Sequence, residues 1–210
     1  MVSERDSDFA VTGLVLAGGR ASRMGGQDKG LIAIAGQPMV GHVLARLRPQ
    51  VRELLINANR NEADYAGFGA PVVADRMPEF PGPLAGMASG LAAATTPWVV
   101  TAPCDSPLVP RDLVARLQLA LQADAGDLAV VESAGRLQPV FALLPVRLLG
   151  DLEAYLAAGE RKIDRWFGRH RMAIADFSDC PEAFINVNTP EERDALEHRL
   201  HNEESGADRA

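Results

Sequence analysis

The chain alternates between short apolar runs and segments in which apolar residues recur every three or four positions. The run at residues 11–16, Val-Thr-Gly-Leu-Val-Leu, leads directly into Ala17-Gly18-Gly19, which is typical of a buried strand that enters a tight loop. Between Pro38 and Pro49 the spacing fits one face of a helix, so we predict a helix over residues 39–47. By the same criteria, further strands are predicted at residues 51–57, 71–74, 98–102, 128–131, 138–144 and 171–177, and further helices at 84–94, 110–121, 146–158, 161–167 and 191–200.

This alternation indicates parallel β-α-β units, in which helices cover both faces of a mostly parallel central sheet. We therefore predict an α/β fold. The length of 210 residues suits a single domain, because domains commonly have about 100–200 residues, and we place it at residues 10–200. The polar segments 1–9 and 203–210 are expected to be disordered tails.

Composition limits the location and partners of the protein. No apolar run approaches the roughly 20 residues that cross a bilayer, and the first residues are polar and acidic, unlike a secretory signal. The two cysteines, Cys104 and Cys180, do not suggest a disulfide framework. The net charge of −7 argues against general nucleic-acid binding, which needs a basic surface. We expect a cytoplasmic protein that binds neither a membrane nor a nucleic acid.

The densest chemical signal is the glycine loop, which we define as residues 16–29, Leu-Ala-Gly-Gly-Arg-Ala-Ser-Arg-Met-Gly-Gly-Gln-Asp-Lys. It carries the cations Arg20, Arg23 and Lys29 against the single acid Asp28, so it is locally basic in an acidic protein. Its four glycines would let backbone N–H groups turn toward phosphate oxygens, and Lys29 would add a point charge. The spacing fits neither the Walker A motif nor the dinucleotide-binding motif. The alternative is a flexible loop with solvated cations.

Three further polar residues, Asn57, Asp75 and Asp105, end or follow predicted strands. Open α/β sheets bind ligands outside the carboxyl ends of their strands. Asp105 near a bound triphosphate would be a natural Mg²⁺ ligand, while Asn57 and Asp75 suit hydrogen bonds to a base or a ribose. The alternatives are turn-forming or turn-capping roles for all three. Cys104 has no histidine nearby in sequence, so we interpret it as a small buried residue and not as a nucleophile.

Four segments of the chain together resemble the molybdenum cofactor guanylyltransferases, the molybdopterin-guanine dinucleotide synthase family of the nucleotidyltransferase superfamily. They are the glycine loop, Pro81-Gly82-Pro83-Leu84-Ala85-Gly86-Met87, Pro103-Cys104-Asp105-Ser106-Pro107 and Asn186-Val187-Asn188-Thr189-Pro190. The glycine loop alone would indicate only the superfamily, whereas the four segments in this order are more discriminating. The similarity spans residues 11–195 and implies a single-domain, Rossmann-like nucleotidyltransferase fold.

The resemblance also implies roles for individual residues. The GTP-contacting positions would be Leu16, Ala17, Gly18, Gly19, Lys29, Asn57, Asp75 and Asp105. The catalytic residues would be Lys29, Asp105 and Arg23, with Asp105 as the Mg²⁺ ligand. Asn186 and Asn188 would contact molybdopterin.

The implied reaction transfers GMP from GTP to the phosphate of molybdenum-molybdopterin and releases pyrophosphate, with Mg²⁺ as the cofactor. A monomer or small oligomer would act on these two substrates, in transient contact with other molybdenum cofactor biosynthesis proteins. A cytidylyltransferase or a sugar-phosphate nucleotidyltransferase of the same fold is the alternative among enzymes. A nucleotide-binding module without catalysis is the alternative from another class, and the presence of both Lys29 and Asp105 argues against it.

Overall fold

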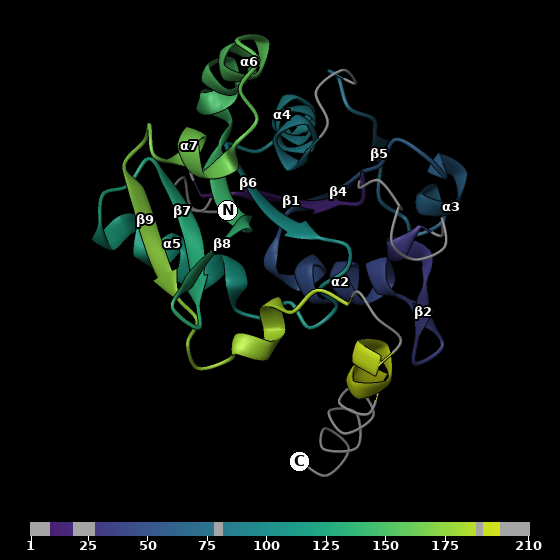
Figure 1. The fold of residues 1–210 in the computed structure, drawn as a ribbon. Coiled ribbons are helices and arrows are strands. Elements are labelled where there is room, and N and C mark those ends of the chain that lie inside the picture. The colour runs from purple at the N-terminus through teal and green to yellow at the C-terminus, as the bar shows by residue number, and fades with distance from the viewer. Residues whose placement is uncertain (1–8, 19–27, 78–81, 188–190, 198–210) are drawn as a thin grey trace, which may run out of the picture.

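The computed structural model describes residues 9–18, 28–77, 82–187 and 191–197 (Figure 1). Its main sheet has seven strands in the order β5-β4-β1-β6-β8-β7-β9. The strands are β1 (Val11–Leu16), β4 (Glu53–Asn57), β5 (Val72–Val73), β6 (Trp98–Pro103), β7 (Leu128–Ser133), β8 (Arg136–Pro145) and β9 (Met172–Asp176). Neighbouring strands run parallel except for β8, which is antiparallel to both β6 and β7. The predicted α/β fold with a mostly parallel sheet is confirmed.

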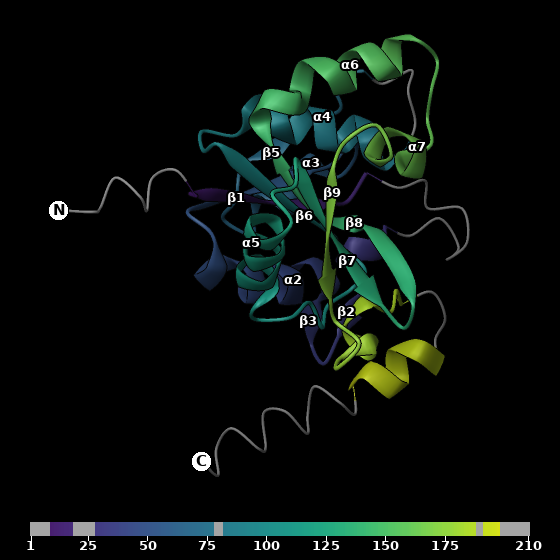
Figure 2. The same ribbon diagram turned by 90° about the vertical axis from the view of Figure 1, so that its left-hand side faces the viewer.

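Helices cover both faces of this sheet (Figures 1 and 2). They are α2 (Met39–Leu47), α3 (Glu62–Ala66), α4 (Pro83–Ala93), α5 (Leu113–Ala123), α6 (Leu149–Ala157) and α7 (Ile163–Phe167), with a further helical segment at residues 191–197. Short 3₁₀ helices lie at η1 (Lys29–Leu31), η2 (Arg48–Gln50), η3 (Val146–Leu148) and η4 (Pro181–Phe184). In Figure 1, α4 and α6 lie above the sheet and α2 lies below it. Within the described ranges, no helix is long and apolar enough to span a bilayer.

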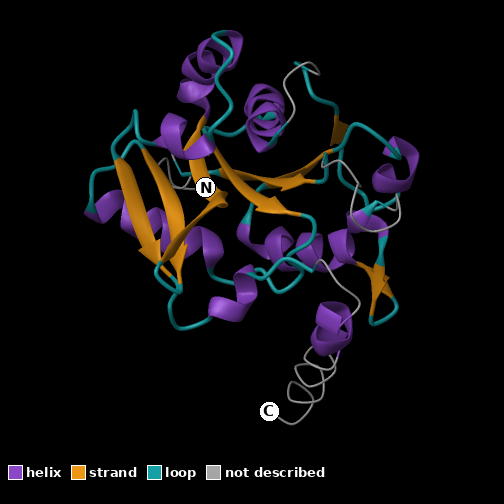
Figure 3. Ribbon diagram, viewed as in Figure 1, coloured by secondary structure: helices purple, strands orange, loops and turns teal. Residues whose placement is uncertain are grey.

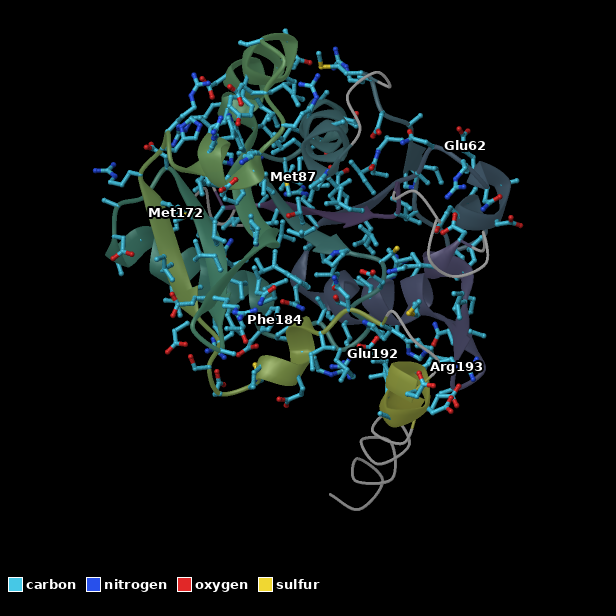
Figure 4. All side chains as sticks on the ribbon, in the orientation of Figure 1. Glu62, Met87, Met172, Phe184, Glu192 and Arg193 are labelled. Carbon is cyan, nitrogen blue, oxygen red and sulfur yellow. The ribbon has the colours of Figure 1, made fainter. Side chains whose placement is uncertain are left out.

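Two layers of apolar side chains hold these elements together, one on each face of the sheet. One layer joins α2 and α5 to the strands, and the other joins α4, α6 and α7 to the opposite face. Figure 4 shows Met87 of α4 in this second layer, between its helix and the sheet. The central strand β1 contributes to both layers, through Val15 and Leu14 respectively. This burial on two faces explains why β1 is an almost continuous apolar run in the sequence.

The structure contains a hairpin and an α-helix that were not predicted. The strands β2 (Ala33–Ile34) and β3 (Gln37–Pro38) form a hairpin, and α3 follows β4. The hairpin turns at Ala35 and Gly36, whose φ angles are 48° and 76°, as a tight two-residue turn requires. Alanine rarely adopts a positive φ, so the sequence contained no usual turn signal at this point.

Several predicted boundaries differ from those in the structure by one to three residues, and two of them have a visible cause. The helix predicted at 110–121 begins at Leu113, because the preceding residues form a turn in which the Leu113 N–H donates to the Pro110 carbonyl (3.4 Å). The strand predicted at 71–74 pairs with β4 only through Val72 and Val73. The predicted disordered tails lie outside the described residues, except for Phe9, whose ring stacks on Trp98 at 5.8 Å between centroids.

Helix α4 approaches β1 most tightly at Gly90, which generates a test of the packing. A Cβ atom at this position would lie 2.8 Å from Leu14 Cδ1 and 3.0 Å from Leu14 Cγ, and Leu14 is fully buried. We expect Gly90→Ala to lower the free energy of unfolding by up to about 2 kcal/mol, because overpacking costs about 1–3 kcal/mol and the gain in helix propensity offsets only about 1 kcal/mol of it. Urea-induced unfolding measures the change.

The matched control is Gly150→Ala in α6, where an added Cβ would meet no atom within 4 Å. This variant should keep or slightly increase the stability, because only the helix propensity changes. A Gly90→Ala protein as stable as the Gly150→Ala protein would contradict the close approach of α4 to β1.

Candidate active site

The carboxyl ends of β1, β4 and β6 lie side by side, because β1 pairs in parallel with both neighbours (Figure 3). Hydrogen bonds continue beyond the strands: the Ala17 N–H donates to the Asn57 carbonyl (2.8 Å), and the Cys104 N–H donates to the Leu16 carbonyl (3.0 Å). The start of the glycine loop is therefore fixed between the end of β4 and the loop after β6. This is the edge at which open α/β sheets bind ligands.

One group of polar side chains at this edge comprises Asn57, Asn59 and Asp75. Asn57 Nδ2 donates to Asp75 Oδ1 (2.9 Å) and to the Val73 carbonyl (3.1 Å). Asn59 Nδ2 donates to Asp75 Oδ2 (2.7 Å), and Asn59 Oδ1 accepts from the Asp75 N–H (2.7 Å). Gly18 lies against this group, since a Cβ atom on it would be 3.2 Å from Asn57 Oδ1. The structure thus brings together three predicted site residues, Gly18, Asn57 and Asp75.

A second group forms where the end of the glycine loop meets the loop after β6. Lys29 Nζ lies 3.3 Å from Asp105 Oδ2, and the two side chains are 25% and 14% exposed. Lys29 is the first residue of η1, and Asp105 follows the last residue of β6 by two positions. Partial shielding from water strengthens the attraction between the two charges beyond that of a fully exposed pair. The pair offers a donor for an anion and a carboxylate for a cation at one place.

Asp28, next to Lys29, is held by donors from three positions. Its Oδ1 accepts from the Gly30 N–H (3.3 Å) and from the Tyr65 hydroxyl (2.5 Å), and its Oδ2 accepts from Asn61 Nδ2 (3.0 Å). Tyr65 is fully buried, and this burial raises the pKa of its hydroxyl far above the usual value, so the group stays protonated. These contacts were not predicted, because residues 62–66 had not been recognised as a helix.

The segment near residue 186 lies beside the loop that carries Asp105. The Ser106 hydroxyl donates to Asn186 Oδ1 (2.7 Å), and the Val187 N–H donates to the Asp105 carbonyl (3.0 Å). Two hydrogen bonds therefore join the segment that carries the predicted residue Asn186 to the segment that carries Asp105. The contact of Ser106 with Asn186 was not predicted, because it joins residues 80 positions apart.

The remaining predicted site residues, Gly19, Arg23 and Asn188, lie outside the described residues. Among the residues that the structure does describe, no three His, Cys, Asp or Glu side chains gather into a group that could hold a metal ion. A divalent ion at Asp105 would therefore take most of its ligands from a bound molecule or from water. Magnesium sites with one or two carboxylates and substrate phosphate oxygens have this composition.

A cavity of about 150 Å³ lies near the Asp105 loop but has a different character. It is bounded on one side by the helical segment 191–197, and Glu192 on its rim is labelled in Figure 4. Its lining is Pro107, Leu108, Glu182, Ile185, Val187, Glu192, Ala195 and Leu196. The lining is mostly apolar and its two charged residues are acidic, so the cavity does not suit a phosphate group.

The glycine loop after the first strand, the acid after β6 and the amides at the end of β4 together define an α/β protein of the nucleotide-binding class. The chain belongs to the family of MobA-like NTP transferase domains, which matches residues 13–174.

Individual relatives agree with this family. A molybdenum cofactor guanylyltransferase of Cupriavidus taiwanensis is 55% identical over 194 residues, which covers 90% of this chain and 97% of that protein. A protein of the same name from Shewanella sediminis is 48% identical over 190 residues, with the same 90% and 97% coverage. Among solved structures, molybdopterin-guanine dinucleotide biosynthesis protein A from Archaeoglobus fulgidus has a TM-score of 0.74 at 20% identity, covering 91% of this chain and 99% of that one. This last similarity shows a shared fold.

The thiol of Cys104 provides a test of the burial at this site. Cys104 is only 7% exposed, and burial, followed by the nearby Asp105 and Asp28 carboxylates, raises the pKa of its thiol well above the usual value. Cys180 is partly exposed, and burial and Asp179 also raise the pKa of its thiol. Because the thiolate is the reactive form, we expect Cys104 in the folded protein at pH 8 to react with a thiol reagent at least about tenfold more slowly than Cys180.

Timed labelling followed by peptide mass spectrometry gives the two rates. In urea the rates should become similar, because the burial is lost. A Cys104 thiol that reacts in the folded protein as fast as Cys180 would contradict the enclosed position of the side chain.

Proposed function

We propose that this protein transfers GMP from GTP to the phosphate of molybdenum-molybdopterin and releases pyrophosphate. The observation that carries the proposal is the contact of Lys29 with Asp105 (3.3 Å) at the carboxyl edge of the sheet. The relative from Cupriavidus taiwanensis, 55% identical over nearly its whole length, supports the choice of guanylyl transfer within the family. Lys29 and Asp105 both lie in segments that resemble the guanylyltransferases, namely the glycine loop and residues 103–107.

The chemistry demands charge neutralisation more than proton transfer. The attacking oxygen of the acceptor phosphate is already anionic, so it needs no strong base. The barrier comes from the approach of two anions and from the charge that develops on the departing pyrophosphate. Lys29 would neutralise the leaving phosphates, while N–H groups of the glycine loop after Ala17, whose own N–H donates to the Asn57 carbonyl, would bind their oxygens. Arg23, in the same loop, is proposed to add a further positive charge.

A divalent cation fits the donor set at Asp105, and we propose magnesium. The Asp105 side chain is 14% exposed and lies beside Lys29, at the strand edge where the glycine loop begins. Magnesium bound there would neutralise negative charge near the α-phosphate and act as a Lewis acid. The role of Asp105 is to hold the ion, while the backbone hydrogen bond from Val187 to the Asp105 carbonyl fixes the position of the loop.

The Asn57, Asn59 and Asp75 group is proposed to bind the nucleoside. Guanine presents an N–H and an amine on the same edge, and a carboxylate accepts from both. Each oxygen of Asp75 already accepts one amide N–H, and each has capacity for a second donor. The two amides would thus hold the carboxylate in a fixed orientation for guanine.

The acceptor side of the site is proposed to include Asn186 and Asn188. Asn186 supports this placement because it lies beside the Asp105 loop, in hydrogen-bond contact with Ser106. We further propose that the protein acts in the cytoplasm as a monomer or small oligomer and contacts other molybdenum cofactor biosynthesis proteins transiently. The large charged product, which has to reach an acceptor enzyme, supports such contacts.

The first test compares nucleotides. Anaerobic incubation with molybdopterin, Mg²⁺ and each nucleoside triphosphate should yield a dinucleotide product from GTP, identified by its mass. We expect kcat/KM for GTP to exceed that for CTP or UTP by at least about 10²-fold, because a hydrogen-bonding site strongly rejects a base that lacks its donors. CTP as the preferred substrate would identify a cytidylyltransferase instead. Tight GTP binding without pyrophosphate release would indicate a binding module.

The second test concerns the metal ligand. Asp105→Ala should lower kcat for pyrophosphate release by about 10²–10³-fold, as the loss of one electrostatic interaction in a transition state commonly does. The fold should persist, because the Asp105 side chain is partly exposed at the edge of the sheet and is not part of the apolar core. Asp124→Ala, at an exposed position that ends α5, is the control and should keep wild-type turnover. Wild-type turnover of Asp105→Ala at saturating Mg²⁺ would overturn the assignment.

A further inference from the structure

The glycine loop contains one acid, Asp28, directly before the lysine proposed to bind phosphate. A free carboxylate at this position would repel a triphosphate. Asp28 instead accepts from the Gly30 N–H, the Tyr65 hydroxyl and Asn61 Nδ2. A carboxylate has roughly four acceptor sites, so donors of the protein occupy most of them. These contacts indicate that the Asp28 carboxylate holds the backbone of the loop in place and does not bind a metal ion.

The hydroxyl group of Tyr65 packs closely between Asp28 and Gly30. The side chain is fully buried, and its oxygen lies 2.5 Å from Asp28 Oδ1. A Cβ atom on Gly30 would lie 2.5 Å from the same hydroxyl and 3.2 Å from Cys104 Sγ. Glycine is therefore required at position 30 for the hydroxyl to fit beside the carboxylate. An apolar contact between α3 and the loop would not by itself require the hydroxyl to lie so close to Gly30.

The position of Asp28 determines the position of Lys29. Asp28 is the N-cap of η1, where its side chain accepts from the Gly30 N–H and its carbonyl accepts from the Leu31 N–H (3.1 Å). Lys29 is the first residue of that turn, and its ammonium group extends to Asp105. A shift of Asp28 would therefore displace the backbone from which the Lys29 side chain starts.

We infer that Tyr65 and Asn61 of the α3 region act through Asp28 to position Lys29 for the phosphates of the nucleotide. Tyr65 is thus a positioning residue for the transfer reaction, although it touches neither substrate. The inference rests on the proposed function, because it takes the phosphates as the target of Lys29. An electrostatic contact depends steeply on geometry in a shielded site, and a misplacement of about 1 Å can lower a rate by about 10²-fold.

A purely structural role of Tyr65 would also predict some loss of stability on mutation, so the test needs a matched control. Tyr155 provides it: the side chain is 5% exposed, lies on α6 and donates its hydroxyl to the Lys162 carbonyl (2.9 Å). Tyr155 belongs to the apolar layer on the α4 and α6 face, whereas Tyr65 belongs to the layer on the other face. Tyr65→Phe and Tyr155→Phe each remove one hydroxyl and one hydrogen bond from a buried ring.

The experiment measures the melting temperature, the Kd for GTP and the steady-state kinetics of both variants with Mg²⁺ and molybdopterin. We expect similar changes in melting temperature. Only Tyr65→Phe should raise the Kd for GTP and lower kcat/KM for GTP, the latter by about 10–100-fold. Wild-type kinetics of Tyr65→Phe would overturn the inference and leave the proposed function intact.

A double-mutant cycle with Lys29→Ala identifies the route of the effect. If Tyr65 acts through Lys29, the change in the Kd for GTP caused by Tyr65→Phe should shrink to less than about twofold in the Lys29→Ala background. An undiminished effect there would overturn the inference. Lys29→Ala with wild-type GTP binding and turnover would instead contradict the proposed role of Lys29, and so the two failures are distinguishable. Lys162→Ala, at the only other lysine of the chain, is the control for loss of a lysine charge.

A second variant covers the case in which Tyr65→Phe unfolds below the assay temperature. Asp28→Asn keeps the size of the side chain and leaves Tyr65 in place, but removes the charge and one acceptor oxygen. The same loss of kcat/KM and the same dependence on Lys29 are expected. Wild-type kinetics of Asp28→Asn would overturn the inference.

Discussion

The contact between Lys29 and Asp105 depends on the parallel pairing of β1 and β6. The two residues are 76 positions apart, yet their charged groups are 3.3 Å apart, because the loops that follow these strands leave the sheet at the same edge. The register continues into the loops through the hydrogen bond from the Cys104 N–H to the Leu16 carbonyl. The apolar layers that hold β1 in the centre of the sheet therefore also set the geometry of the charges.

The carboxylates at this edge differ in the partners that hold them, and this difference separates their roles. Asp28 and Asp75 accept hydrogen bonds from neutral donors of the protein, which fix the orientation of both carboxylates and leave each Asp75 oxygen able to accept a second donor. The side chain of Asp105, in contrast, lies 3.3 Å from a cation, the ammonium group of Lys29. A charge pair can exchange partners when a phosphate and a metal ion arrive, because each member finds a new group of opposite charge. Under the proposed function, local charge, more than the net charge of −7, would govern the binding of an anionic substrate.

The sheet and much of the site were predictable because both depend on simple periodic patterns. A strand buried on both faces, such as Val11–Leu16, is apolar along its length, and polar residues directly after such strands have to lie at one edge of a parallel sheet. Asn57, Asp75 and Asp105 are therefore predicted to lie at the same edge, and the parallel pairing of β5, β4, β1 and β6 confirms this position. Their roles in binding and catalysis stay predictions.

The unpredicted features depend on contacts or backbone angles that leave no pattern in the sequence. The turn at Ala35 and Gly36 needs a positive φ at an alanine. Helix α3 is only five residues long, which is too short for the 3.6-residue apolar pattern to repeat. The contact of Tyr65 with Asp28 joins residues 37 positions apart and exists only once α3 packs beside the glycine loop. The strand β8 was predicted, but its antiparallel direction was not, because apolar content does not reveal the direction of a strand.

The most direct measurement is a crystal structure of the protein with Mg²⁺ and a non-hydrolysable GTP analogue. The account predicts that the triphosphate lies along the glycine loop, that the Lys29 ammonium contacts its oxygens, and that the metal ion bridges the phosphates and the Asp105 carboxylate. It would be contradicted by a nucleotide bound elsewhere, for example in the apolar cavity beside Leu108, or by a metal ion that makes no contact with Asp105.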